Sequence, residues 1–134
     1  MRILIAEDDL ASRKFLQKFL SQFGECDLVV DGEEAVEAFM IAWDEGQPYE
    51  LICLDIMMPN LDGLKALKVI RDIEKEKPAA PGDRAKIVMI TALDEIDKVT
   101  AAFEIGCEGY AAKPVDTGKF LEVLVKLNLV DGGK

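Results

Sequence analysis

The sequence contains no histidine among its 134 residues, and this absence removes several kinds of chemistry. A Ser-His-Asp or Cys-His nucleophilic centre, a histidine-ligated zinc site and a phosphohistidine in this chain are all excluded. Only three cysteines occur, at Cys26, Cys53 and Cys107, and no two of them form a CxxC pair. Neither a disulfide framework nor a zinc site is indicated, so we expect small buried side chains in a reducing compartment.

Long apolar runs and an excess of basic residues are also missing. No run approaches the roughly 18–20 residues that a membrane helix needs, and the start, MRILIAEDD, turns acidic too early for a signal peptide. Acidic residues outnumber basic ones by 26 to 16, and the resulting net charge of −10 opposes direct binding to nucleic acid or to an anionic membrane. We therefore expect a cytoplasmic protein that contacts neither directly.

Short apolar runs alternate with amphipathic stretches along the whole chain. The apolar runs predict five strands: Arg2–Ala6, Cys26–Val30, Leu51–Asp55, Ile87–Ile90 and a weaker Gly109–Ala112. Helical spacing follows each run, in the stripes Leu16/Phe19/Leu20/Phe23, Ala35/Val36/Phe39/Met40/Trp43, Leu64/Leu67/Ile70, Ile96/Val99/Phe103 and Phe120/Leu121/Leu124/Val125. Alternation of this kind predicts βαβ units, and strands that are apolar on both faces predict helices on both sides of a parallel sheet. The expected fold class is α/β, a doubly wound three-layer sandwich.

Local signals suggest where these elements begin and end. Asp9 is a favourable helix N-cap, and Gly24 and Gly106 are candidate helix ends. The polar segment Glu74–Arg84 is interpreted as a solvated connection within one domain. We expect that domain to span residues 1–129, with a frayed tail over residues 130–134.

Polar side chains gather where the expected strands end. Glu7 and Asp8 follow the first strand, Asp55 ends the third, Thr91 follows the fourth and Lys113 follows the fifth. In open α/β sheets the ligand lies beyond these carboxyl ends. Partly buried carboxylates repel one another unless they share a proton or bind a cation, and an all-oxygen ligand set suits Mg²⁺. Thr91 and Lys113 could then hold the oxygens of a phosphoryl group transferring to Asp55 as nucleophile.

Four segments at these strand ends, ILIAEDD, LICLDIMMPNLDG, IVMITA and GYAAKP, closely resemble the receiver domain of two-component response regulators, in a single-domain, chemotaxis-regulator-like form. The resemblance covers about residues 2–129 and implies the flavodoxin-like strand order 2-1-3-4-5, which is known for a chemotaxis member of the family. It implies that Asp55 is the phosphoacceptor and Asp8 a direct Mg²⁺ ligand. It also implies that the Met57 backbone carbonyl binds the metal and that Glu7 acts on it through water.

The same resemblance implies a switch and its partners. Thr91 matches the switch hydroxyl, Lys113 the ion-pairing lysine and Tyr110 the aromatic side chain that changes rotamer on activation, and Lys113–Pro114 matches a cis peptide bond. The implied donor is a sensor histidine kinase or a histidine phosphotransfer protein. The implied readout is a downstream protein target that binds the surface of the fourth helix, fifth strand and fifth helix, and a homodimer that forms on phosphorylation is compatible with it. Such a protein is not an enzyme with a separate substrate, because it catalyses only its own phosphorylation and dephosphorylation.

Two positions beside the expected phosphate path bear on the lifetime of the modification. In the family, the residues two places after the phosphoacceptor and after the switch hydroxyl tune dephosphorylation. Here these residues are Met57 and Leu93, and neither apolar side chain can orient an attacking water. The hypothesis is a fairly long-lived phosphoaspartate.

Two alternative functions remain open. The chain could serve as an unphosphorylated, receiver-like docking module, although the complete acidic set argues against that. It could also be a Mg²⁺-dependent phosphatase with an aspartate nucleophile, but such an enzyme needs an acid two residues after the nucleophile, where Met57 stands, and a cap domain for which the chain has no length. A dinucleotide site is excluded because GxGxxG is absent.

Overall fold

The computed structural model describes residues 1–76 and 84–131. Strands and helices alternate along the chain in the order β1 (Arg2–Ala6), α1 (Leu10–Leu20), β2 (Glu25–Val29), α2 (Gly32–Asp44), β3 (Leu51–Asp55), α3 (Gly63–Glu76), β4 (Lys86–Thr91), η2 (Leu93–Glu95), α4 (Lys98–Ile105), β5 (Gly109–Ala112) and α5 (Thr117–Lys126). The five strands are all parallel and lie in the order β2-β1-β3-β4-β5. Both the fold class and the strand order expected from the sequence are confirmed.

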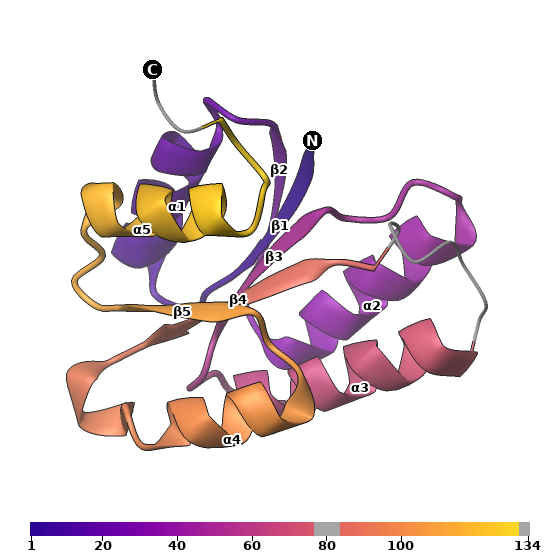
Figure 1. Ribbon diagram of the computed structural model, residues 1–134. Helices are drawn as coiled ribbons and strands as arrows, with labels where there is room; N and C mark the ends of the chain where they lie inside the picture. Colours follow the sequence, from indigo (N-terminus) through magenta and orange to yellow (C-terminus); the bar gives the residue numbers. More distant parts are fainter. Residues whose placement is uncertain (77–83, 132–134) are drawn as a thin grey trace.

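The sheet separates two apolar cores, because each strand directs alternate side chains to opposite faces. Helices α1 and α5 cover one face, and α2, α3 and α4 cover the other (Figure 1). Phe120 and Leu16 fill the first core, and Phe39 and Leu67 fill the second. Strand β3 is buried along its whole length between them, which explains its unbroken apolar run LICL.

Helices α1, α2 and α5 each begin at an aspartate that caps the first turn. The carboxylates of Asp9, Asp31 and Asp116 accept hydrogen bonds from backbone N–H groups three residues later, at 2.8–3.0 Å. The N-cap predicted for Asp9 is therefore confirmed, and Asp31 caps α2 in the same way. Each cap turns the chain at or near the carboxyl end of a strand, where the polar side chains gather.

Two of the predicted helix details are wrong at α1. The helix ends at Leu20 with Ser21 as its cap, so Phe23 lies beyond it and Gly24 does not end it. Gly24 has another role: a Cβ there would lie 2.2 Å from the carbonyl oxygen of Met1, which accepts a hydrogen bond from the N–H of Glu25. This close approach leads the chain into β2, one residue earlier than the strand Cys26–Val30 predicted from the sequence.

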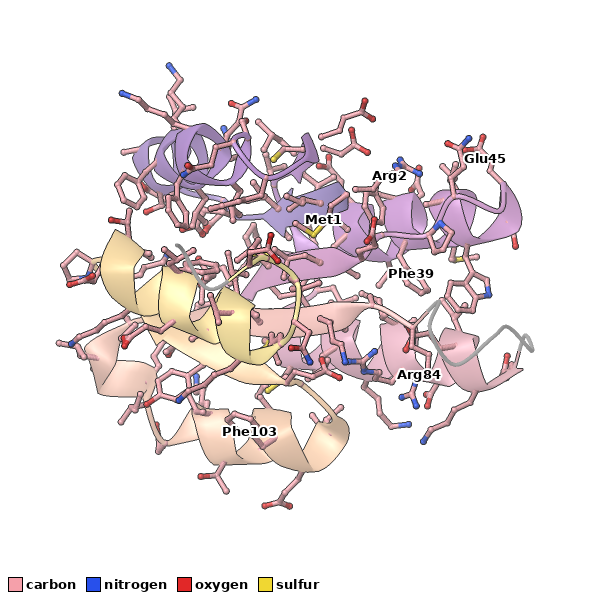
Figure 2. The ribbon with its side chains drawn as sticks, turned by 45° about the horizontal axis from the view of Figure 1, so that its top comes forward. Met1, Arg2, Phe39, Glu45, Arg84 and Phe103 are labelled. Carbon is pink, nitrogen blue, oxygen red and sulfur yellow. The ribbon has the colours of Figure 1, made fainter. Side chains whose placement is uncertain are left out.

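Part of the predicted apolar stripes faces solvent. Met40 on α2 is 43% exposed, and Ile96 and Phe103 are 43% and 46% exposed. Figure 2 shows Phe103 on α4. Ile96 precedes α4, which begins only at Lys98, and of the predicted stripe only Val99 is buried. Helical spacing identifies the apolar side of a segment but not whether another element covers that side. Gly106 ends α4 as expected.

The segment predicted as a solvated connection begins inside α3. Glu74 is buried and accepts a hydrogen bond at 2.6 Å from Nη1 of Arg71, which lies one turn earlier on α3. The prediction is therefore wrong for residues 74–76, which are helical. Residues 77–83 lie outside the described residues. Arg84 is exposed just before β4 (Figure 2). At the end of the chain, Val130 packs against the core beneath α1 and α5, and residues 132–134 are not described.

Candidate functional site

Four parallel strands deliver polar side chains to one edge of the sheet. Strand β1 is followed by Glu7 and Asp8, β3 ends at Asp55, β4 ends at Thr91, and Lys113 follows β5. The strand register brings these ends to one level, since Asp55 pairs with Ile90 and Thr91 pairs with Ala112. The edge therefore assembles residues that lie as far apart in the sequence as Glu7 and Lys113.

Lys113 joins two buried carboxylates at the centre of this edge. Its Nζ lies 2.6 Å from Oε1 of Glu7 and 2.8 Å from Oδ2 of Asp55. Glu7 is fully buried and Asp55 is 3% exposed, whereas Asp8 faces solvent. Carboxylate oxygens of Glu7, Asp8 and Asp55 lie within 4.8 Å of one another. The cluster is thus open to solvent on the side of Asp8 and closed on the side of Glu7.

The single positive charge of Lys113 does not fully compensate the negative charges that Glu7 and Asp55 would carry if both were ionised. Burial and the neighbouring Asp55 carboxyl raise the pKa of Glu7 to about 8 although Lys113 acts in the opposite direction. Burial alone would lower the pKa of Lys113, but its close contacts with the Asp55 and Glu7 carboxylates raise it above its ordinary value. Within the described part of the chain, neither oxygen of Glu7 has a well-aligned hydrogen-bond partner. In the absence of a further cation, a proton on Glu7 relieves this repulsion.

The same features suit a hard divalent cation. Two buried carboxylate groups and one exposed one supply oxygen ligands, and the buried oxygens of Glu7 lack aligned donors, as expected where a cation or its water completes the site. The all-oxygen set favours Mg²⁺ over zinc or copper. The residues present therefore fit the metal that the sequence predicted.

The loop after β3 shapes the remaining side of the site. The backbone N–H of Met57 donates to Oδ1 of Asp55 at 3.2 Å, and the N–H of Gly63 donates to the carbonyl of Ile56 at 2.8 Å. A Cβ on Gly63 would lie 2.2 Å from the carbonyl oxygen of Asp55, so only glycine lets α3 begin this close to the strand end. Asp62, just before this glycine, caps the first turn of α3 by accepting from the N–H of Lys65 at 2.9 Å.

The expected switch residues lie at different depths. Thr91 is fully buried, and its hydroxyl donates to the carbonyl of Ala92 at 3.0 Å. Tyr110 is 41% exposed on β5 and meets the ring of Phe103 edge to face, with centroids 6.5 Å apart. Tyr110 is therefore on the outer surface and not in the carboxylate cluster. The Lys113–Pro114 peptide bond is cis.

Arg13 is a site residue that sequence reasoning missed. Its Nη1 donates to the carbonyl of Glu7 at 2.8 Å and, more weakly, to that of Asp8 at 3.4 Å. The side chain thus ties α1 to the loop that carries two acids of the cluster. An arginine on the first turns of an amphipathic helix gives no signal of this role, because most such arginines are solvated.

Comparison with known proteins agrees with this geometry. The sequence matches the response regulator receiver domain family over residues 3–125. The chain belongs to this family. The receiver domain is 33% identical over 123 residues to the chemotaxis protein CheY of Treponema pallidum, covering 90% of this chain and 78% of that protein. It is 38% identical over 115 residues to response regulator MprA of Mycobacterium avium, covering 85% of this chain but only 45% of MprA.

Solved structures show the same fold. The CheX-CheY-BeF₃-Mg²⁺ complex from Borrelia burgdorferi matches the receiver domain with a TM-score of 0.81 and 27% identity, covering 96% of this chain and 89% of the other. The receiver domain of Ssk1, in a co-crystal with the histidine phosphotransfer protein Ypd1 of Saccharomyces cerevisiae, matches with a TM-score of 0.79 and 28% identity, covering 100% and 94%. Among the residues that the structure describes, no helix is long and apolar enough to cross a membrane.

Proposed function

We propose that this receiver domain accepts a phosphoryl group on Asp55, in a Mg²⁺-dependent reaction, from a sensor histidine kinase or a histidine phosphotransfer protein. The observation that carries the proposal is the contact of Lys113 with the buried Asp55 carboxylate at 2.8 Å, beside two further acids. The Ypd1 complex of a similar receiver domain supports a phosphotransfer protein as donor, and the CheY complex, which holds BeF₃ and Mg²⁺, supports the metal.

Each residue has a distinct task in this reaction. Asp8, Asp55 and the backbone carbonyl of Met57 would hold Mg²⁺, with Glu7 acting through water. When bound, the metal neutralises charge on the phosphoryl oxygens. A carboxylate oxygen of Asp55 forms the new P–O bond, while the P–N bond to the donor histidine breaks and its electron pair returns to the imidazole nitrogen. Lys113 stabilises the charge on the transferring group.

The phosphoryl group then shifts the population of two conformations. It adds a charge of about −1.5 to −2, which attracts the hydroxyl of Thr91 and frees space for the ring of Tyr110. The surface that responds is formed by α4, β5 and α5, where Phe103 and Tyr110 are exposed. A pocket of about 470 Å³ lies beside Tyr110 and is also lined by Leu93 of η2. We expect a downstream protein, or a second copy of the chain, to bind there.

This function turns over no separate substrate, so the protein acts as a signalling switch that catalyses only its own phosphorylation and dephosphorylation. Its three free cysteines favour a reducing compartment, and we place the protein in the cytoplasm. Because the chain spans less than half of MprA, any activity that follows phosphorylation in a longer protein is outside the proposal.

Intact mass after incubation with acetyl phosphate and Mg²⁺ tests the proposal directly. We expect a gain of one phosphoryl mass that is lost with EDTA and in Asp55→Asn. Asp62→Asn is the matched control, because Asp62 lies in the same loop and caps α3 without belonging to the acidic cluster. No gain in a protein that still binds Mg²⁺ would favour a docking module, and rapid consumption of acetyl phosphate without an adduct would favour a phosphatase.

A further inference from the structure

Lys98 connects helix α4 to the phosphoacceptor loop. It is the first residue of α4, and its Nζ lies 3.3 Å from Sδ of Met57, whose backbone N–H donates to Asp55. Among the side-chain hydrogen bonds and ion pairs of residues 1–76 and 84–131, this contact is the one that joins α4 to the loop after β3. The ammonium group of Lys98 on α4 therefore contacts a residue, Met57, that is only two positions after the phosphoacceptor Asp55.

The present partners of Lys98 hold it weakly. A thioether sulfur is a poor hydrogen-bond acceptor, and the second partner, Oε2 of Glu95, is 3.9 Å away. The side chain of Lys98 is 40% exposed, so its ammonium can move at little desolvation cost. By contrast, Lys113 is already in contact with both Glu7 and Asp55. Lys98 is thus a nearby cation without a strong anionic partner of its own.

The first turn of α4 is also loosely held. The side chain of Asp97 makes no capping hydrogen bond, and no side chain caps the preceding 3₁₀ turn, within the part of the chain that the structure describes. At the other end of the helix, the carbonyl of Gly106 accepts from Nε of Arg71 at 2.9 Å. A new charge near Met57 would therefore act on the end of α4 that moves most easily.

We propose that Lys98 is a second cationic contact of the phosphoryl group on Asp55, and that this contact draws the first turn of α4 toward the site. The inference rests on the proposed phosphorylation of Asp55. The modified site offers Lys98 a doubly charged acceptor in place of a thioether, and charge-assisted hydrogen bonds are about twice as strong as neutral ones. Because only the modified protein offers this acceptor, the contact favours the active conformation.

The experiment uses beryllium fluoride with saturating Mg²⁺, since a BeF₃⁻ group on an aspartate stands in for the phosphoryl group. The variants are Lys98→Gln, Lys98→Arg and the control Lys126→Gln, which removes an exposed lysine from the last turn of α5. We expect Lys98→Gln to weaken beryllium fluoride binding about two- to tenfold, because the contact is charge-assisted but partly exposed. Lys98→Arg should restore most of the affinity, and Lys126→Gln should leave it unchanged.

Hydrogen exchange at residues 97–101 supplies the readout that a merely structural role would not change. These amides should be equally protected in all variants before beryllium fluoride is added. On addition, exchange should slow in the wild type and in Lys98→Arg but not in Lys98→Gln. Equal affinity and equal slowing in Lys98→Gln would overturn the role of Lys98 alone, whereas a wild type that binds no beryllium fluoride would overturn the proposed function itself.

Discussion

The buried guanidinium of Arg71 should be one of the most sensitive positions for stability outside the site. Arg71 is 3% exposed and donates from Nε to the carbonyl of Gly106, from Nη1 to Glu74 and the carbonyl of Ala85, and from Nη2 to both oxygens of Glu108. These bonds, of 2.6–2.9 Å, connect α3 to the end of α4 and to the starts of β4 and β5. The perturbation is Arg71→Met, which keeps an unbranched side chain but removes the charge and every donor.

The structure indicates the size of the loss. Removing one partner of a buried ion pair typically costs about 3–5 kcal/mol, because the remaining charge is left without compensation. The side chain of Glu74 is 1% exposed and cannot rehydrate, although it keeps a 2.9 Å bond from the N–H of Ala85 and a longer ion pair, of 3.7 Å, with the exposed Arg84. Glu108 is 29% exposed and can regain water. We therefore expect a loss near the lower end of the range, about 3 kcal/mol in the free energy of unfolding.

Urea denaturation at neutral pH measures this change. Lys68→Met is the control on the same helix, because the pair of Lys68 with Asp72 is exposed and should contribute no more than about 0.5 kcal/mol. Adding Glu74→Gln to Arg71→Met should recover part of the loss, since it removes a buried charge whose remaining ion pair, with Arg84, is long and exposed. A loss below about 1 kcal/mol for Arg71→Met, or no recovery in the double variant, would refute the reasoning.

Three further outcomes follow from the acidic cluster and its surroundings. Mg²⁺ should raise the melting temperature of the wild type, and Asp8→Asn or Asp55→Asn should reduce that rise, as thermal denaturation with EDTA controls would show. Because burial beside Asp55 raises the pKa of Glu7 to about 8, the folded protein without metal binds an extra proton between about pH 4.5 and 8, so stability falls as pH rises through this window. Glu7→Gln should therefore stabilise the metal-free protein at pH 9 relative to wild type but not at pH 4, and an equal difference at both values would contradict the assignment. Met57→Gln and Leu93→Gln should each shorten the lifetime of the phosphoprotein, measured by intact mass after removal of the donor, because an amide can orient the attacking water; unchanged lifetimes would contradict the role given to these positions.

Much of the fold could be predicted because burial leaves a direct trace in the sequence. The strand Leu51–Asp55 is buried on both faces, and its unbroken apolar run marks both ends. The stripe through Ile96 and Phe103 has equally clear spacing but is exposed. A helical stripe requires an apolar environment without saying whether the same chain or a partner provides it. For this reason Ile96 and Phe103, which are 43% and 46% exposed, were predicted in one stripe with the buried Val99.

The acidic cluster was predictable for a topological reason. Parallel strands place their carboxyl ends at one edge, so Glu7, Asp55 and Lys113 had to meet there once the strands were assigned. Arg13, which supports the cluster, and Arg71, which lies outside the site, could not be found in this way. Both act through contacts with backbone carbonyls of other segments. Those contacts depend on three-dimensional packing and leave no periodic signal in the chain.

The two ends of α4 are held by interactions of very different strength. This difference gives a route by which a charge at Asp55 can affect the exposed surface of α4 and β5. The far end is fixed by Arg71 through the carbonyl of Gly106, inside a buried ion-pair network. The near end lacks a side-chain cap within the described residues and meets the site only through Lys98 and the thioether of Met57. A charge that arrives at Asp55 would therefore rotate the helix about its fixed end rather than displace it. Such a rotation would move the first turn of α4 most and would also tilt Phe103, whose ring contacts Tyr110, so one local charge would alter the apolar surface that a partner binds.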